Sequence, residues 1–314
     1  MQELCECGLL WRTCSRKLGC LAEVRAFVCG IIPMERGLPL DSKPVGKEDV
    51  MSLETVTSSA DASIAYWRSG EGPPLVLVHG TAADHSRWTP ILPGFEQHFT
   101  VCAVDRRGRG GSSDSGDYAI EREFEDIAAV VESLEEPGFL LGHSYGALCA
   151  LEAALLTRNV RKMVLYDPVM DVTGEGINPP GLVDRLETLL KAGDRDGVVD
   201  TMLREVVGAP PEVVEYMRSQ PAWQARVSAA HTIPRELRAG EAYRFDAERF
   251  GDLEVPTLLL TGSDSPSTFE EAEKVVAEAL PNCRLVVMPG QGHVAMDTGT
   301  DLFTTEVLRF LEGS

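Results

Sequence analysis

The stretch that most restricts how this chain can fold runs from Gly138 to Ala150. A short apolar run ends at Ser144, which has Gly142 two residues before it and Gly146 two residues after it, and an Ala- and Leu-rich segment follows directly. This order predicts a strand, a sharp turn and a helix, and the glycines leave room for strained backbone at the serine. Because the helix begins at the turn, its unpaired N–H groups and positive dipole end face any negative charge formed beside the hydroxyl. The stretch therefore predicts a nucleophilic serine.

Apolar runs alternate with helical segments along much of the chain. Each run is short and continuous, as in strands buried on both faces of a sheet. Helices of ten or more residues between such strands imply right-handed crossovers and a largely parallel sheet. Two earlier segments, 53–57 and 63–67, alternate in polarity and predict antiparallel edge strands. The other expected strands are 75–78, 101–104, 139–141, 162–166, 255–260 and 284–288, and the expected helices are 85–97, 121–134, 269–280 and 301–311.

The alternation stops between residues 169 and 251. Here we expect no strand but several short amphipathic helices interrupted by prolines. This region predicts a helical cap inserted into an α/β core that comprises residues 51–168 and 252–314. Residues 1–50 have no clear periodicity and no signal-peptide pattern, so we expect them to be a disordered or non-native extension.

The composition argues against several classes of function. Of the 314 residues, 49 are acidic and 29 are basic, which gives a formal net charge of -20. Such a field repels nucleic acids and anionic membranes, so we expect neither as a partner. No apolar run reaches the roughly 18 residues of a membrane span. Most of the 8 cysteines crowd into the first 30 residues without a C-x-x-C pair, so we expect no zinc site and a reducing, cytoplasmic location.

A serine nucleophile needs a base, and the base needs a group that fixes its tautomer. His293 follows a glycine-rich loop after the last expected strand, at the same end of the sheet as Ser144, and we expect it to be the base. The orienting acid should also lie at a strand's carboxyl end. Asp264 and Asp167 each follow an expected strand. We favour Asp264, because an Asp-Pro step such as Asp167-Pro168 more often ends a strand.

An oxyanion formed at the serine needs fixed N–H donors close to it. Tyr145 directly follows the nucleophile, and Thr81 follows the turn His79-Gly80, whose glycine permits close approach. We therefore expect the backbone N–H groups of Thr81 and Tyr145 to form the oxyanion hole. His79 and His143 flank functional glycines, where a histidine more often supports a loop than transfers protons.

Three motifs carry a family resemblance, namely His79-Gly80, Asp105-x-Arg107-Gly108-x-Gly110-x-Ser112 and Gly142-x-Ser144-x-Gly146. Together with the chain order Ser, Asp, His, they closely resemble the α/β-hydrolase superfamily over about residues 53–314. The likeness is strongest to its small esterase, cofactor-free haloperoxidase and C–C-bond hydrolase branches. It implies an eight-stranded, mostly parallel sheet with a helical cap after the sixth strand, and a structural role for residues 105–112. Relatives that open epoxides or remove halide have aspartate at the nucleophile position, so the serine argues against those activities.

The reaction we expect is transfer of an acyl group to water, as in a carboxylesterase acting on a small-molecule ester through an acyl-enzyme. Such chemistry needs no metal ion and no organic cofactor. Three alternatives stay open: a C–C-bond hydrolase acting on a vinylogous diketone acid, a perhydrolase using acetate and peroxide with the same triad, and a ligand receptor in which slow hydrolysis only traps a signal. The sequence does not indicate an oligomeric state.

Overall fold

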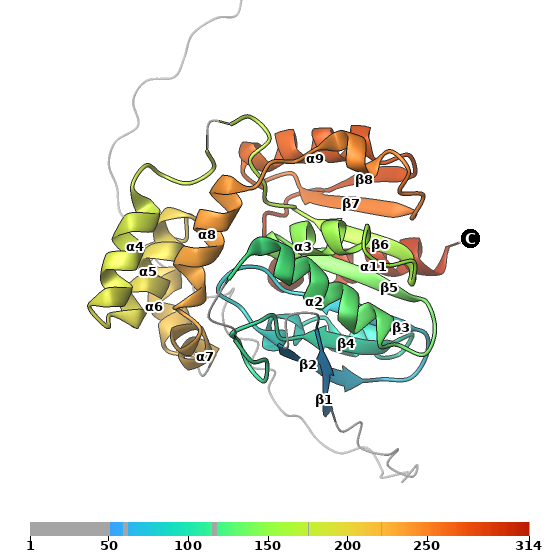
Figure 1. Cartoon of the computed structure of the whole chain (residues 1–314), viewed down its shortest axis with the longest axis horizontal. Coiled ribbons are helices and arrows are strands. Elements are labelled where there is room, and N and C mark those ends of the chain that lie inside the picture. Colours follow the sequence, from blue (N-terminus) through green and yellow to red (C-terminus); the bar gives the residue numbers. More distant parts are fainter. Residues whose placement is uncertain (1–50, 59–61, 115–117, 175, 221, 314) are drawn as a thin grey trace, which may run out of the picture. The chain divides into compact units, whose positions relative to one another are not determined.

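The computed structural model describes residues 51–58, 62–114, 118–174, 176–220 and 222–313. The extension predicted for residues 1–50 lies outside these residues. Across the described residues, one eight-stranded sheet has helices on both of its faces (Figure 1). The predicted fold class, an α/β fold with a mostly parallel eight-stranded sheet, is confirmed.

The strand order in the sheet is β1-β2-β4-β3-β5-β6-β7-β8. β1 pairs antiparallel with β2 and β2 pairs antiparallel with β4, whereas the other pairs are parallel. The first two strands therefore form the antiparallel edge that their polarity pattern predicts. The strands are β1 (Ser52–Thr57), β2 (Ser63–Ser69), β3 (Pro74–Val78), β4 (Thr100–Val104), β5 (Gly138–His143), β6 (Val160–Tyr166), β7 (Thr257–Gly262) and β8 (Cys283–Met288).

The helices that flank the sheet are η2 (His85–Trp88), α1 (Leu92–Phe95), α2 (Ile120–Glu132), α3 (Tyr145–Ala153), η3 (Ala247–Phe250), α9 (Ser267–Ala279), α10 (Ala295–Thr298) and α11 (Thr300–Glu312). The single helix expected over residues 85–97 is wrong, because the segment forms two short pieces, η2 and α1. The break between them includes Pro90, whose nitrogen has no hydrogen to donate to a helix. Within the described part of the chain, we find no helix with the length and apolar composition that a membrane crossing requires.

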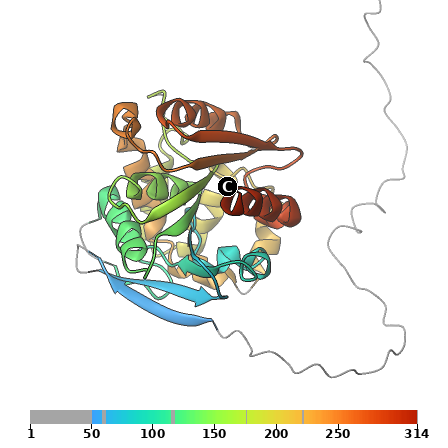
Figure 2. The same ribbon diagram turned by 90° about the vertical axis from the view of Figure 1, so that its right-hand side faces the viewer.

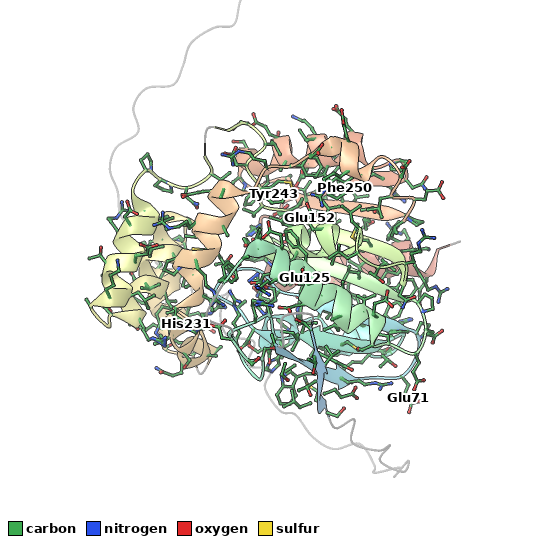
Figure 3. The ribbon with its side chains drawn as sticks, viewed as in Figure 1. Glu71, Glu125, Glu152, His231, Tyr243 and Phe250 are labelled. Atoms are coloured by element: carbon green, nitrogen blue, oxygen red, sulfur yellow. The ribbon has the colours of Figure 1, made fainter. Side chains whose placement is uncertain are left out.

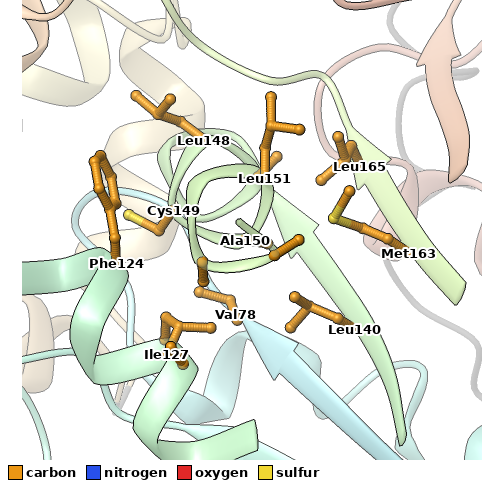
Figure 4. Close-up of a cluster of buried hydrophobic side chains, with 14 of the residues drawn as sticks. Val78, Phe124, Ile127, Leu140, Leu148, Cys149, Ala150, Leu151, Met163 and Leu165 are labelled. Atoms are coloured by element: carbon orange, nitrogen blue, oxygen red, sulfur yellow. The ribbon is translucent and has the colours of Figure 1, made fainter. Parts of the chain in front are cut away.

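Side chains of the central strands point alternately into two hydrophobic cores. Val76 and Val78 of β3 lie in a core shared with α2, α3 and α9, whereas Leu75 and Leu77 lie in a core shared with α1 and α11. Figure 4 shows part of the first core, where Val78 and Phe124 of α2 are close to α3. Figure 2 shows α2 and α3 on one side of the sheet and α11 on the other. Because both faces are covered, these strands are continuously apolar.

Between β6 and β7, in the region we call the helical insertion (residues 169–251), the described residues form five α-helices before the short helix η3. They bury a core of their own that includes Leu186, Val199, Trp223 and Ile233. The described residues of the insertion contain no strand, and prolines begin or interrupt its helices. The insertion helices are α4 (Leu182–Lys191), α5 (Arg195–Glu205), α6 (Pro211–Arg218), α7 (Ala222–Ser228) and α8 (Thr232–Ala242).

The end of the insertion is tied to α3 by a buried carboxylate. Glu152 of α3 accepts hydrogen bonds from the Tyr243 hydroxyl at 2.5 Å and from Arg249 Nη1 and Nη2, both at 2.8 Å. Figure 3 labels Glu152 and Tyr243 side by side, with Phe250 nearby. A charge removed from water requires such pairing, so this contact fixes where the chain leaves the insertion and returns to the sheet.

Candidate active site

Ser144 lies at a tight turn between β5 and α3. Its φ is 59° and its ψ is -126°, a strained conformation for a residue with a Cβ. A Cβ on Gly142 would lie 2.5 Å from the Gly146 carbonyl oxygen, and one on Gly146 would lie 2.3 Å from the Val78 carbonyl oxygen. A Cβ on Gly80 would lie 2.9 Å from Ser144 Cβ. The glycines of the sequence motifs are therefore required for the backbone to pack this closely around the serine.

The histidine expected to be the base pairs with an aspartate. His293 Nδ1 lies 2.8 Å from Oδ2 of Asp167, which directly follows β6. The same oxygen accepts a hydrogen bond from the Ser265 hydroxyl at 2.8 Å. The Asp167 side chain is fully buried and its φ is 44°. Because a carboxylate can only accept, the Nδ1 atom carries the proton and Nε2 is left as the basic nitrogen.

The preference for Asp264 as the partner of His293 is not supported by these contacts. Asp264 is exposed, and its carboxylate accepts a hydrogen bond from the neighbouring Ser263 hydroxyl at 2.9 Å. Its backbone N–H instead donates to the Gln291 carbonyl at 2.8 Å, in the loop that leads to His293. The segment after β7 thus contacts the histidine loop through its main chain. Asp167, the rival assignment, has the geometry of the orienting acid.

Aromatic residues hold His293 in place. The rings of His293 and His143 have their centroids 4.6 Å apart, and His143 Nε2 donates to the His293 carbonyl at 2.8 Å. The Phe269 ring lies 4.7 Å from His293, and the Tyr166 hydroxyl donates to the carbonyl of Gly292. Burial, and then the charge of His293, lower the pKa of His143 well below its ordinary value. His143 is therefore neutral, which fits a supporting role.

Ser144 and His293 lie at the same edge of the sheet. Among the described residues, no hydrogen bond joins the Ser144 hydroxyl to the His293 ring. Catalytic hydrogen bonds often tighten only when substrate binds, so this geometry is compatible with a nucleophile and its base.

Helices of the insertion contact the loop that carries Thr81. Glu236 of α8 lies next to Thr81, which contributes to the lowered pKa of Glu236, and Arg226 of α7 donates from Nη1 to the Ala82 carbonyl. Ala82 has a φ of 55°, a conformation that residues with a Cβ adopt uncommonly. Two insertion helices therefore hold adjacent residues of the expected oxyanion loop.

A buried ionic cluster lies behind this loop. Glu236 Oε1 accepts hydrogen bonds from Arg106 and Arg109, and all three side chains are buried. The guanidinium carbon of Arg106 lies 4.9 Å from the centre of the Tyr145 ring. Burial by itself would raise the pKa of Glu236, but the charges of the two arginines hold it below its ordinary value. The cluster thus connects α8 with Tyr145, one of the two residues expected to donate to an oxyanion.

The segment from residue 105 to residue 112 makes structural contacts. The buried Asp105 carboxylate accepts hydrogen bonds from the backbone N–H groups of His85 and Gly111, each at 2.9 Å. Arg107 makes a two-bond pair with Asp126 of α2, at 2.6 and 2.7 Å. These contacts match the structural role that the family resemblance implies.

Glu236 and Arg226 were not among the residues expected at the site from the sequence. For Glu236 a signal was present, because helical spacing places it on the same face of α8 as the buried Ile233 and Gly240. A charged residue on an apolar face requires a buried partner. For Arg226 we find no comparable signal, since α7 is short and its contact lies 144 residues away in the chain.

Comparisons with known proteins agree with the α/β fold of this chain. A model of the alpha/beta hydrolase family matches residues 75–304. The chain is 27% identical over 271 residues to (E)-2-((N-methylformamido)methylene)succinate hydrolase of Acinetobacter baylyi, covering 83% of this chain and 99% of that protein. It is 26% identical over 264 residues to pimeloyl-[acyl-carrier protein] methyl ester esterase of Vibrio atlanticus, covering 79% and 98%.

A solved structure gives the same result. The crystal structure of an alpha/beta hydrolase from Sphaerobacter thermophilus matches with a TM-score of 0.72 and 33% identity, covering 82% of this chain and 100% of that one. The family model spans most of the chain and includes the serine turn, Asp167 and His293. The protein therefore belongs to the alpha/beta hydrolase family.

Proposed function

We propose that this hydrolase is a serine carboxylesterase that cleaves small to medium esters through an acyl-enzyme. The observation that carries the proposal is the hydrogen bond of 2.8 Å between His293 and the buried Asp167, at the sheet edge where Ser144 sits on its strained turn. This arrangement supplies a nucleophile, a base with a defined tautomer, and a fixed negative charge behind the base.

In the proposed reaction, His293 Nε2 removes the proton from the Ser144 hydroxyl as its oxygen attacks the ester carbonyl. The backbone N–H groups of Thr81 and Tyr145 hold the oxyanion, and α3, which begins at Tyr145, adds its positive dipole end. The imidazolium then protonates the leaving alcohol. Water, deprotonated by the same nitrogen, attacks the acyl-enzyme and releases the acid.

Replacement of the nucleophile tests this proposal. For Ser144→Ala, we expect hydrolysis of p-nitrophenyl acetate, butanoate and octanoate to fall by about four or more orders of magnitude. A fluorophosphonate probe should add one mass increment to the parent protein, on the peptide that contains Ser144. The matched control is Ser228→Ala, which removes an exposed serine of α7. Wild-type rates of hydrolysis by Ser144→Ala would rule out Ser144 as the nucleophile.

A second candidate is a hydrolase for substrates that carry a carboxylate. It is favoured by the relative named for a substituted succinate, a compound with two carboxylates, and by two arginines beside the expected oxyanion loop. Arg87 and Arg226 line one small surface hollow together with Ala83 and Asp84. Burial, and then the charge of Arg87, lower the pKa of Arg226 below its ordinary value. A substrate carboxylate would offset this unfavourable burial of charge.

Two acyl substrates of similar length separate the candidates. If Arg226 binds a carboxylate, Arg226→Gln should raise KM about tenfold for p-nitrophenyl hydrogen succinate and leave KM for p-nitrophenyl butanoate unchanged. Arg238→Gln is the control, since Arg238 lies on α8 in exposed ion pairs with Asp184 and Glu187. Equal losses on the two substrates would mean that Arg226 only supports the Ala82 carbonyl.

A further inference from the structure

A second buried carboxyl group lies behind Asp167. Glu273 of α9 is only 2% exposed, and its carboxyl group lies next to Asp167 and to Thr261 of β7. Within the described residues, Asp167 Oδ1 and Glu273 Oε1 are both buried and have no donor. Two ionised carboxylates cannot hydrogen-bond to each other, because neither has a proton to donate. The contact is satisfied only if one of the two groups is protonated.

The surroundings decide which carboxyl group keeps the proton. Asp167 Oδ2 accepts a hydrogen bond from the Ser265 hydroxyl and another from His293 Nδ1, so this carboxylate already acts as an acceptor for two donors. Burial raises the pKa of Glu273 to about 8; the hydrogen bond from Thr261 lowers it, whereas Asp167 and then Glu270 of the same helix raise it. At neutral pH the proton therefore resides on Glu273.

We propose that Glu273 is a positioning residue that donates a hydrogen bond from its protonated carboxyl group to Asp167, and so orients that carboxylate toward His293. Asp167 then has donors from three elements: His293 after β8, Ser265 after β7 and Glu273 on α9. Loss of the Glu273 proton would place two buried negative charges in contact beside the histidine. The role in catalysis rests on the proposed function of Ser144, whereas the shared proton does not.

The direction of the pH effect follows from the raised pKa of Glu273. The neutral form is present below about pH 8, and the hydrogen bond to Asp167 is lost as the pH rises through that value. One pH unit above the pKa, about nine tenths of the groups are ionised. Wild-type kcat/KM should therefore fall by about tenfold between pH 7 and pH 9. The stability linked to this proton is lost from near the ordinary glutamate pKa of 4.5 up to about 8, so the part lost above pH 7 corresponds to about a tenfold fall in the folding equilibrium constant.

The test compares Glu273→Gln, Glu273→Ala and wild type. Glutamine donates at every pH, so Glu273→Gln should keep kcat within about threefold at pH 7 and lose the alkaline decline. Glu273→Ala lacks a donor, so at both pH values its kcat should be about tenfold below that of wild type at pH 7, with little change in KM. Glu278→Gln, on the exposed side of α9, is the control and should retain the wild-type profile. An alkaline decline that persists in Glu273→Gln would overturn the proposal.

Thermal unfolding keeps this test independent of the catalytic assignment. Even if Ser144 were not the nucleophile, Tm of the wild type should drop between pH 7 and pH 9 more than Tm of Glu273→Gln. Equal drops would show that Glu273 and Asp167 share no proton, whatever the activity assays give.

Discussion

An aspartate follows each of the neighbouring strands β6 and β7, and the two aspartates differ in how they contact the loop that carries His293. The two strands are parallel neighbours, with Tyr166 opposite Leu260. Asp167 is fully buried and pairs with the His293 ring, whereas Asp264 is exposed. The end of β7 instead contacts the loop through its backbone, since a Cβ on Gly262 would lie 2.0 Å from the Gln291 carbonyl oxygen.

This difference shows that a position after a strand does not determine what a side chain does. Asp167 comes directly after the last residue of β6, still within the buried sheet edge. Asp264 comes two residues after the end of β7, where the chain has already turned toward solvent. The distance from the strand end therefore decides between a carboxylate in the site and one outside it.

The largest expected effect separates the two aspartates directly. Asp167→Asn should lower kcat by about 10⁴, because the amide stabilises the wrong histidine tautomer. Asp264→Asn should leave kcat within about twofold, since an exposed side chain away from special contacts contributes little. Ester hydrolysis by the two purified variants, with circular dichroism to verify folding, measures the difference. A large loss in Asp264→Asn alone would restore the assignment made from sequence.

A smaller effect is expected where β7 acts through its backbone. Gly262→Ala introduces a Cβ at 2.0 Å from the Gln291 carbonyl oxygen, so the histidine loop must move. We expect kcat to fall on the order of 100-fold, as displacements of about 1 Å can do, together with a lower Tm. Gly251→Ala is the control, because its Cβ would meet nothing closer than 3.7 Å. Unchanged kcat in Gly262→Ala would mean that this backbone contact does not position His293.

The smallest of these effects concerns Ser265, which follows β7 and donates a hydrogen bond to the carboxylate of Asp167, which follows β6. Ser265→Ala removes the hydrogen bond of 2.8 Å to Asp167 Oδ2. One hydrogen bond to a charged group corresponds to about a tenfold loss in kcat. Ser263→Ala is the comparison, since its hydroxyl contacts Asp264 and the N–H of Gly290. Equal losses in the two variants would show that the loop, and not the acid, is affected.

Most of the fold could be predicted because its signals are local. Continuous apolar runs identify strands buried on both faces, and the glycines on either side of Ser144 indicate that the backbone packs closely there. The choice between Asp167 and Asp264 was not local, because it depends on which way each side chain leaves the sheet edge. The contacts of Arg226 and Glu236 with the Thr81 loop also join residues far apart in sequence, and the spacing of apolar residues does not predict such contacts.

The contacts of α7 and α8 with residues 81 and 82 also bear on how far this enzyme can be redesigned by exchanging parts. A graft that replaced the helical insertion to change substrate range would also remove Arg226 from the Ala82 carbonyl and Glu236 from Thr81. It would leave Arg106 and Arg109 buried without their shared carboxylate. A transplanted insertion therefore needs an arginine and a glutamate at the positions of Arg226 and Glu236. Although the insertion lies outside the sheet, its helices contact the loop of residues 81 and 82 beside Ser144.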